Sequence, residues 1–148
     1  MNSIIMCIGN RHGGDDAVGP YIYDKLKNWK SDDFVVLDCG TVPENFTSVV
    51  KKQKPQRLIL IDAVDMNLDS GEIRVIPMEK IAKMHVSTHN IPLHILMSYL
   101  GQHVSNIVMI GIQPQQFRKK MGNQIGKAAN KVIQQLKKDD IDSLKVLS

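Results

Sequence analysis

Short apolar runs alternate with amphipathic stretches along the whole chain. The runs are rich in β-branched residues and end at turn-forming residues, which is typical of strands. They span residues 3–8, 34–38, 57–62, 72–76 and 106–112. Three of them are almost continuously apolar, as expected for strands that helices cover on both faces of a sheet.

The stretches between these runs place apolar side chains three or four residues apart, the spacing of a helix. They predict helices around residues 20–29, 46–50, 78–84, 91–100 and 124–136. Strands that alternate with helices indicate an α/β fold. We therefore expect a three-layer sandwich, in which a twisted, mostly parallel sheet of about five strands lies between two layers of helices.

The segment 72–76 departs from this alternation. The turn formed by Asp69, Ser70 and Gly71 follows the strand at 57–62 too soon for a helical crossover. This strand is therefore predicted to pair antiparallel at an edge of the sheet. No linker or repeat divides the chain, so we expect one domain over residues 1–148, with a flexible tail at 139–148.

The composition narrows the class of protein. Of the 148 residues, 43% are hydrophobic and 23% are charged, as in ordinary globular proteins. No apolar run approaches the roughly 20 residues that cross a bilayer, and the N-terminus lacks the basic region of a signal peptide. Cys7 and Cys39 are too few for a disulfide framework, so we expect a reduced protein of the cytoplasm.

The net charge of +4 is unevenly distributed. Residues 113–148 hold eight basic and three acidic side chains, either as the solvated face of a terminal helix or as a surface that attracts an acidic partner. Aromatic residues make up only 5% of the chain, and no nucleic-acid-binding motif is present. We therefore expect neither a nucleic acid nor a membrane as partner.

The glycine-rich loop after the first strand, "GNRHGGDDAVGP" at 9–20, carries the first candidate chemistry. Its glycines fit neither the dinucleotide pattern G-x-G-x-x-G nor the P-loop pattern. Asp15 and Asp16 would repel a phosphate at this position, because phosphate needs donors there. The two carboxylates suit a cation, although either of them could instead cap the helix that follows.

Further acidic residues follow the other strands, and the carboxyl ends of parallel strands gather at one edge of a sheet. Asp62 ends the strand at 57–62, where a buried carboxylate needs a cation or hydrogen-bond donors. It could also form a turn or a cap. Asp65, in the same loop, is expected to be more exposed. Asp38 and Glu44 follow the second strand, and either could hold a loop together through backbone hydrogen bonds, a role that we favour for Asp38.

Three of the five histidines lie in the segment "MHVSTHNIPLH" at 84–94. His85 and His89 have the spacing of a helical metal pair, but the segment lacks the glutamate of H-E-x-x-H, which argues against a zincin. His89 stands at a junction between loop and helix and could point into the site, or it could be a surface residue. Together with Asp16 and Asp62 it would provide two oxygen ligands and one nitrogen ligand, compatible with Zn²⁺, Ni²⁺, Co²⁺ or Fe²⁺.

Taken together, these residues resemble the hydrogenase maturation endopeptidases of the [NiFe] hydrogenase system, especially the branch that serves hydrogenase 3. The resemblance spans residues 4–114. It rests on the order and spacing of six blocks, "GNRHGGDDAVGP" (9–20), "DCGTVPEN" (38–45), "RLILIDAVDM" (57–66), "GEIR" (71–74), "THNIPL" (88–93) and "GIQP" (111–114).

The resemblance implies an α/β fold, a monomer, and removal of the C-terminal extension of a hydrogenase large-subunit precursor once nickel is in place. It also implies that nickel is carried by the substrate, and that other divalent ions such as zinc, cadmium or calcium can replace it in crystals. The family's nickel-contacting positions fall on Asp16, Asp62 and His89. The general base stays open, with Asp15 and Asp38 as secondary candidates.

Two departures from the family pattern stand out. Cys39 occupies a position where the related motif commonly has glycine, and it is either a soft metal ligand or a packed thiol. After "GIQP" the chain is shorter and more basic than usual, around residues 118–120. A second interpretation is a non-enzymatic nickel-binding accessory of hydrogenase assembly, with the same ligands and no cleavage.

Overall fold

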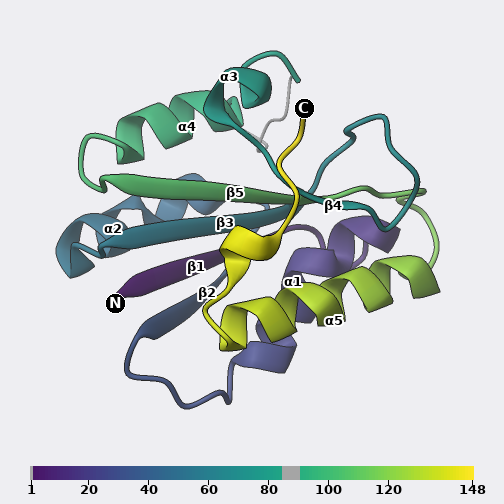
Figure 1. Ribbon diagram of the computed structural model, residues 1–148, viewed down its shortest axis with the longest axis horizontal. Helices are drawn as coiled ribbons and strands as arrows, with labels where there is room; N and C mark the ends of the chain where they lie inside the picture. Colours follow the sequence, from purple (N-terminus) through teal and green to yellow (C-terminus); the bar gives the residue numbers. More distant parts are fainter. Residues whose placement is uncertain (1, 85–90) are drawn as a thin grey trace.

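A computed structural model describes residues 2–84 and 91–148. Five strands form one sheet in the spatial order β2-β1-β3-β5-β4 (Figure 1). Their bounds are Ser3–Ile8 (β1), Phe34–Gly40 (β2), Arg57–Ala63 (β3), Ile73–Val75 (β4) and Asn106–Ile112 (β5). The first, second, third and fifth strands run parallel, and β4 pairs antiparallel with β5 at one edge. The α/β fold and the antiparallel edge strand predicted from the sequence are confirmed.

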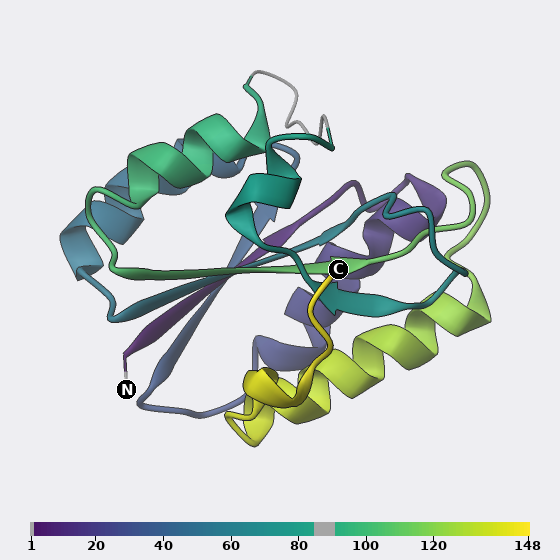
Figure 2. The ribbon, with the colours of Figure 1, turned by 45° about the horizontal axis from the view of Figure 1, so that its top comes forward.

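Helices cover both faces of the sheet. Helices α1 and α5 lie on one face, and α2, α3 and α4 lie on the other (Figures 1 and 2). Their bounds are Val18–Leu26 (α1), Thr47–Gln53 (α2), Met78–Ile81 (α3), Leu93–Leu100 (α4) and Asn123–Lys137 (α5). Each helix predicted from the apolar spacing is present, with ends that differ by a few residues.

The buried strands explain why the apolar runs are nearly continuous. Alternate residues of β3 point to opposite faces, so Ile59 and Ile61 pack against α1 and α5 while Leu58 and Leu60 pack against the other layer. Both faces are therefore hydrophobic, and the polar residues of β1, β3 and β5 lie toward the ends of these strands. Asp62 follows this alternation at the carboxyl end of β3, where it pairs in register with Gly111 of β5.

The segment 139–148, expected to be a flexible tail, is instead packed onto the domain. Ile141 and Leu144 are buried against the cluster that holds α1 and α5. Val146 forms a parallel bridge with Val75 of β4, and Asp139 forms an ion pair of 2.6 Å with Arg57. The segment is short and holds three aspartates, so the three-residue spacing of these two apolar residues was not enough by itself to predict that they pack.

Within the described parts of the chain, no helix is both long and apolar enough to span a membrane.

Candidate metal-recognition site

The glycine-rich loop leaves the carboxyl end of β1 and enters a short 3-10 helix, Gly14–Ala17. A Cβ atom on Gly9 would lie 2.0 Å from the backbone oxygen of Asp16, so only glycine allows the loop to fold back this closely. Gly14 begins the 3-10 helix with a φ of +61°, in the left-handed region that favours glycine. The glycines therefore shape a compact loop that fixes the two neighbouring aspartates.

Asp16 lies in this 3-10 helix and is half-buried. Its Oδ2 accepts a hydrogen bond of 3.0 Å from the backbone N–H of Asn10, which closes the loop. The residues at the N-cap positions of the 3-10 helix and of α1 are Gly13 and Ala17. Helix capping, the alternative for both aspartates, is therefore not the arrangement that the structure has.

Asp62, at the end of β3, is only 8% exposed. Among the described residues its Oδ1 has no hydrogen-bond partner. Burial raises the pKa of Asp62 well above its usual value, and the nearby charge of Asp16 raises that pKa further, against a backbone hydrogen bond with Ala63 that lowers it. Asp16 and Asp62, the two carboxylates predicted to lie together, are thus close enough to interact. Asp62 is the buried one, and its Oδ1 lacks a hydrogen-bond partner among the described residues.

The third predicted ligand, His89, and its neighbour His85 lie outside the described residues. Within the residues that the structure describes, no three His, Cys, Asp or Glu side chains come together as a metal site. Ile91, two positions after His89, packs against the cluster on the α4 face of the sheet. Asp62 falls in the β3 alternation that points to this same face.

Asp15 has a different role from its neighbour. It is 1% exposed, and its carboxylate accepts three backbone hydrogen bonds, from Gln115 at 2.7 Å, Gln116 at 3.0 Å and Gly122 at 2.9 Å. These donors lie about 100 residues further along the chain, on the segment that leads into α5. Asp15 therefore holds that segment against the glycine-rich loop, and an engaged carboxylate of this kind is a poor choice for the general base.

Asp38, the other secondary candidate for the base, is bound by Arg11. The guanidinium of Arg11 lies 2.7 Å from Asp38 and 2.7 Å from Asp24 of α1, and it joins the loop to β2 and α1. The backbone N–H of Gly40 approaches Asp38 only to 3.4 Å. Asp38 was expected to hold its own loop through backbone hydrogen bonds, but its main partner is the side chain of Arg11 from the glycine-rich loop.

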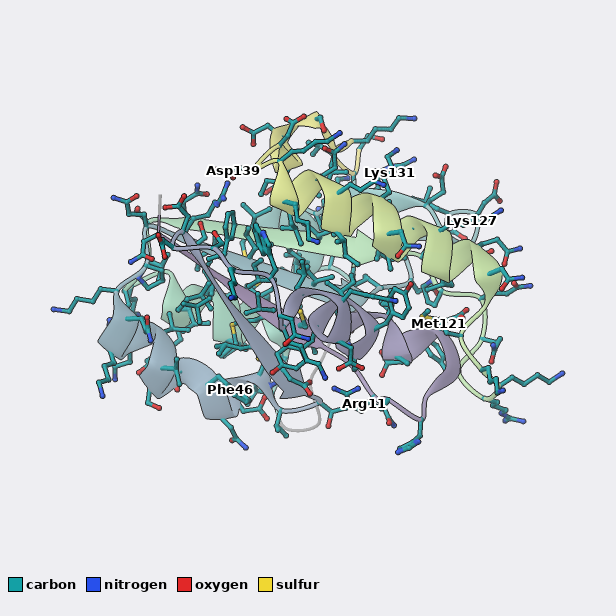
Figure 3. The ribbon with its side chains drawn as sticks, turned by 90° about the horizontal axis from the view of Figure 1, so that it is seen from below. Arg11, Phe46, Met121, Lys127, Lys131 and Asp139 are labelled. Atoms are coloured by element: carbon teal, nitrogen blue, oxygen red, sulfur yellow. The ribbon has the colours of Figure 1, made fainter. Side chains whose placement is uncertain are left out.

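Beside Arg11, a cavity of about 540 Å³ opens between the glycine-rich loop and the segment after β2. Its lining includes Asn10, Arg11, Asp38 and Phe46. Figure 3 shows Arg11 and Phe46 on the same side of the molecule. The cavity lies next to the backbone N–H that binds Asp16, so it can receive a polypeptide close to the two carboxylates.

Cys39 is buried in the cluster on the α2 and α4 face. Burial, together with the charge of Asp38, raises the pKa of its thiol to about 12. The thiol is therefore protonated at neutral pH. Cys39 is also only 1% exposed within that hydrophobic cluster, which favours the packed thiol over the soft ligand.

Gln113 was not among the residues predicted to form the site. This buried side chain accepts hydrogen bonds from the backbone N–H groups of Met66 at 2.6 Å and Leu68 at 3.2 Å, and it donates to Asp65 at 3.1 Å. It thereby fixes the loop after Asp62 to the end of β5. The sequence block "GIQP" at 111–114, which contains Gln113, was the signal that could have identified this residue. Asp65 itself is exposed, as predicted.

The chain was compared with known proteins. The model of the hydrogenase maturation protease family matches residues 20–139, most of the chain. The hydrogenase 3 maturation protease of Escherichia coli is 38% identical over 115 residues, which cover 77% of this chain and 74% of that protein. The chain belongs to the hydrogenase maturation protease family. It is therefore an endopeptidase of hydrogenase maturation, and the alternative of a non-enzymatic accessory is set aside.

Solved structures agree with this maturation protease assignment. An endopeptidase named HycI from Escherichia coli superimposes with a TM-score of 0.90 at 34% identity, covering 100% of this chain and 97% of that one. A [NiFe] hydrogenase maturation protease from Thermococcus kodakarensis gives a TM-score of 0.84 at 29% identity, covering 94% and 92%. The family resemblance and the fold drawn from the sequence are both confirmed.

Proposed function

We propose that this maturation protease removes the C-terminal extension of a [NiFe] hydrogenase large-subunit precursor after nickel insertion, and that Asp16, Asp62 and His89 bind the nickel carried by that substrate. The observation that carries the proposal is the buried Oδ1 of Asp62, which has no partner among the described residues and lies near a second carboxylate. Such a pair is destabilised by its own charge and is relieved by a cation.

This arrangement gives a physical reason for waiting until nickel is present. A precursor without metal would cover the two neighbouring carboxyl groups and bring nothing to balance their negative charge, which opposes binding. A nickel-loaded precursor brings positive charge to the same place and accepts oxygen and nitrogen ligands. Selection for the loaded substrate then follows from electrostatics and needs no conformational change.

In the proposed reaction, water adds across the peptide bond. Its oxygen joins the carbonyl carbon, the C–N bond breaks, and a proton reaches the leaving amine. Nickel can polarise the carbonyl or the water when the scissile bond is held beside it. Asp16 and Asp62 would fix the metal, and the 540 Å³ cavity lined by Arg11 and Phe46 would accept the adjoining polypeptide.

The direct test is to incubate the protein with a nickel-loaded precursor and measure the mass of the large subunit. We expect His89→Ala to slow processing by about 100-fold or more, since loss of a direct ligand should exceed the 10–100-fold cost of losing a supporting partner. His85→Ala and His94→Ala serve as controls, with expected changes within about twofold. Normal processing by His89→Ala together with loss in either control would reject the choice of histidine.

Nickel binding is expected to weaken as the pH falls. The pKa of Asp62 is raised, so this ligand must release its proton to bind the metal, and the ordinary pKa of histidine near 6.5 adds a second proton below roughly pH 6. Calorimetry in buffers of different ionisation enthalpy should detect the released protons. Affinity that stays constant from neutral to acid pH would contradict both ligands.

A further inference from the structure

A second groove, of about 480 Å³, lies between α1 and the segment that leads into α5. Four of its lining residues are cationic, and Asp24 is the one acidic residue that lines it. The four are Arg11, Arg118, Lys119 and Lys120. Because Arg11 already binds Asp24, the groove presents the three cations of residues 118–120 as its uncompensated charge.

The backbone that carries these three cations is held in place by Gln116. Its Oε1 accepts the backbone N–H groups of Arg118 and Lys119, both at 2.8 Å, and its Nε2 donates to the backbone oxygen of Lys120 at 3.0 Å. Asp15 fixes both ends of the segment through its three hydrogen bonds. The cations are thus presented from an ordered turn.

The three cationic side chains are themselves exposed. Within residues 2–84 and 91–148, no acidic side chain lies within 4.0 Å of any of them. Ordering the backbone beforehand lowers the entropy lost on binding, which favours recognition of an anionic partner at this place.

The groove also adjoins the metal-recognition site. Gly14 and Ala17, the first and last residues of the 3-10 helix that contains Asp16, both line it. Arg11 lines both this groove and the 540 Å³ cavity and forms the boundary between them. Figure 3 shows Arg11 and Met121, another lining residue, on the same side of the molecule. A polypeptide bound at the carboxylates can therefore continue into the groove.

We propose that this groove, formed by Arg11, Met121 and the cations of residues 118–120, binds an acidic peptide segment of the hydrogenase precursor next to the cleaved bond. The inference rests on the proposed function and adds a specificity determinant to it. Charge complementarity selects the partner, and the apolar side chains of Ala17, Pro20 and Met121 give a floor for the aliphatic parts of glutamate. Among the described lining residues only Tyr21 and His12 carry aromatic rings, so stacking platforms of the kind that bind single-stranded nucleic acid are sparse.

The test uses the full chain and a labelled ten-residue peptide of alternating glutamate and glycine, with a glutamine version of the same length as control. The variant R118Q/K119Q/K120Q should bind the glutamate peptide about tenfold more weakly at low salt, because each exposed ion pair contributes modestly and three are lost. The salt dependence of binding should also become smaller. The glutamine peptide should bind weakly to both proteins.

A matched variant separates the groove from the overall charge of the protein. K127Q/K131Q/K137Q removes the same charge from the exposed face of α5, where Figure 3 shows Lys127 and Lys131. We expect this variant to keep the affinity of the original protein within about twofold. An equal loss of affinity for the glutamate peptide in both variants would mean that the net charge of the protein, not the groove, determines binding. That result would overturn the proposal. A single-stranded oligonucleotide that binds more tightly than the glutamate peptide, and loses that affinity in R118Q/K119Q/K120Q, would assign the groove to nucleic acid instead.

Processing of the nickel-loaded precursor distinguishes failure of this inference from failure of the proposed function. If the original protein does not cleave the precursor, the proposed function fails, whatever the peptide shows. If it cleaves and R118Q/K119Q/K120Q cleaves with the same KM, the groove does not contact the client and the inference fails alone. The expected result is a KM raised about tenfold with little change in kcat, since these side chains hold the substrate away from the reacting bond.

Discussion

Asp62→Asn is expected to abolish processing and at the same time to stabilise the metal-free protein. The amide has almost the same shape as the carboxyl group, but it carries no charge to be desolvated at this buried position beside Asp16. We expect the free energy of unfolding to rise by on the order of 1 kcal/mol at neutral pH. Processing should fall below detection, because the neutral amide is a poor ligand for the metal.

The pH dependence of this effect follows from the direction of the shift. The pKa of Asp62 is higher in the folded protein than in the unfolded chain, so folding is favoured while the group is protonated, and that stability is lost as the pH rises through the folded-state pKa. The gain from Asp62→Asn should therefore be present at neutral pH and vanish in acid, below about pH 4. Urea unfolding at several pH values measures it.

Two outcomes would contradict this account of Asp62. A variant that is less stable than the original at neutral pH would mean that the carboxylate is compensated in the free protein. A variant that still cleaves the nickel-loaded precursor would mean that Asp62 does not bind the metal. Asp65→Asn is the matched control, because Asp65 is an exposed neighbour that is not a proposed ligand. Its carboxylate accepts a hydrogen bond from the side chain of Gln113.

Asp15→Ala is expected to reduce stability strongly, by about 3 kcal/mol, since it removes three hydrogen bonds to one buried carboxylate. The backbone N–H groups of Gln115, Gln116 and Gly122 would lose their partner at the junction between the glycine-rich loop and α5. Thermal unfolding should show a lower Tm. Amide exchange of residues 115–122 should accelerate more than that of the central strands.

Asp16→Ala is the matched control for this prediction. The two aspartates are adjacent, yet Asp16 is half-buried and accepts a backbone hydrogen bond from Asn10, whereas Asp15 is buried and accepts three. Asp16→Ala should therefore lose nickel binding and processing while costing about 1 kcal/mol or less in stability. If Asp15→Ala left stability unchanged, its three hydrogen bonds would contribute nothing net, and the assignment of structural and functional roles would fail.

Much of the fold was predictable because local pattern and long-range packing agree. The apolar runs form strands with both faces buried, and the early Asp69-Ser70-Gly71 turn correctly identified β4 as an antiparallel edge strand. Asp16 and Asp62 were predicted to lie together because the carboxyl ends of parallel strands share one edge of the sheet. The structure supports the proximity of these two carboxylates through the effect of Asp16 on the pKa of Asp62. Metal binding by them and by His89 stays a prediction.

The remaining features depend on partners that no local pattern reveals. Asp15 differs from Asp16 only through donors about 100 residues away, so the sequence could not tell which of the two aspartates holds the fold together. Arg11 acquires its role because β2 and α1 bring Asp38 and Asp24 to the same place. Residues 139–148 form only a short 3-10 turn and an isolated β-bridge, so their apolar side chains show no sustained pattern that reveals packing.

The last residues of the chain also protect the sheet from unwanted assembly. β4 has only three residues, and its outer side is bridged by Val146 through backbone hydrogen bonds from Val75 to Lys145 and from Leu147 to Val75. An uncovered strand edge readily recruits a strand from another molecule. Shortened versions of the protein should therefore retain residue 147, and affinity tags are better attached ahead of β1, so that this covering segment stays undisturbed during crystallisation and assay.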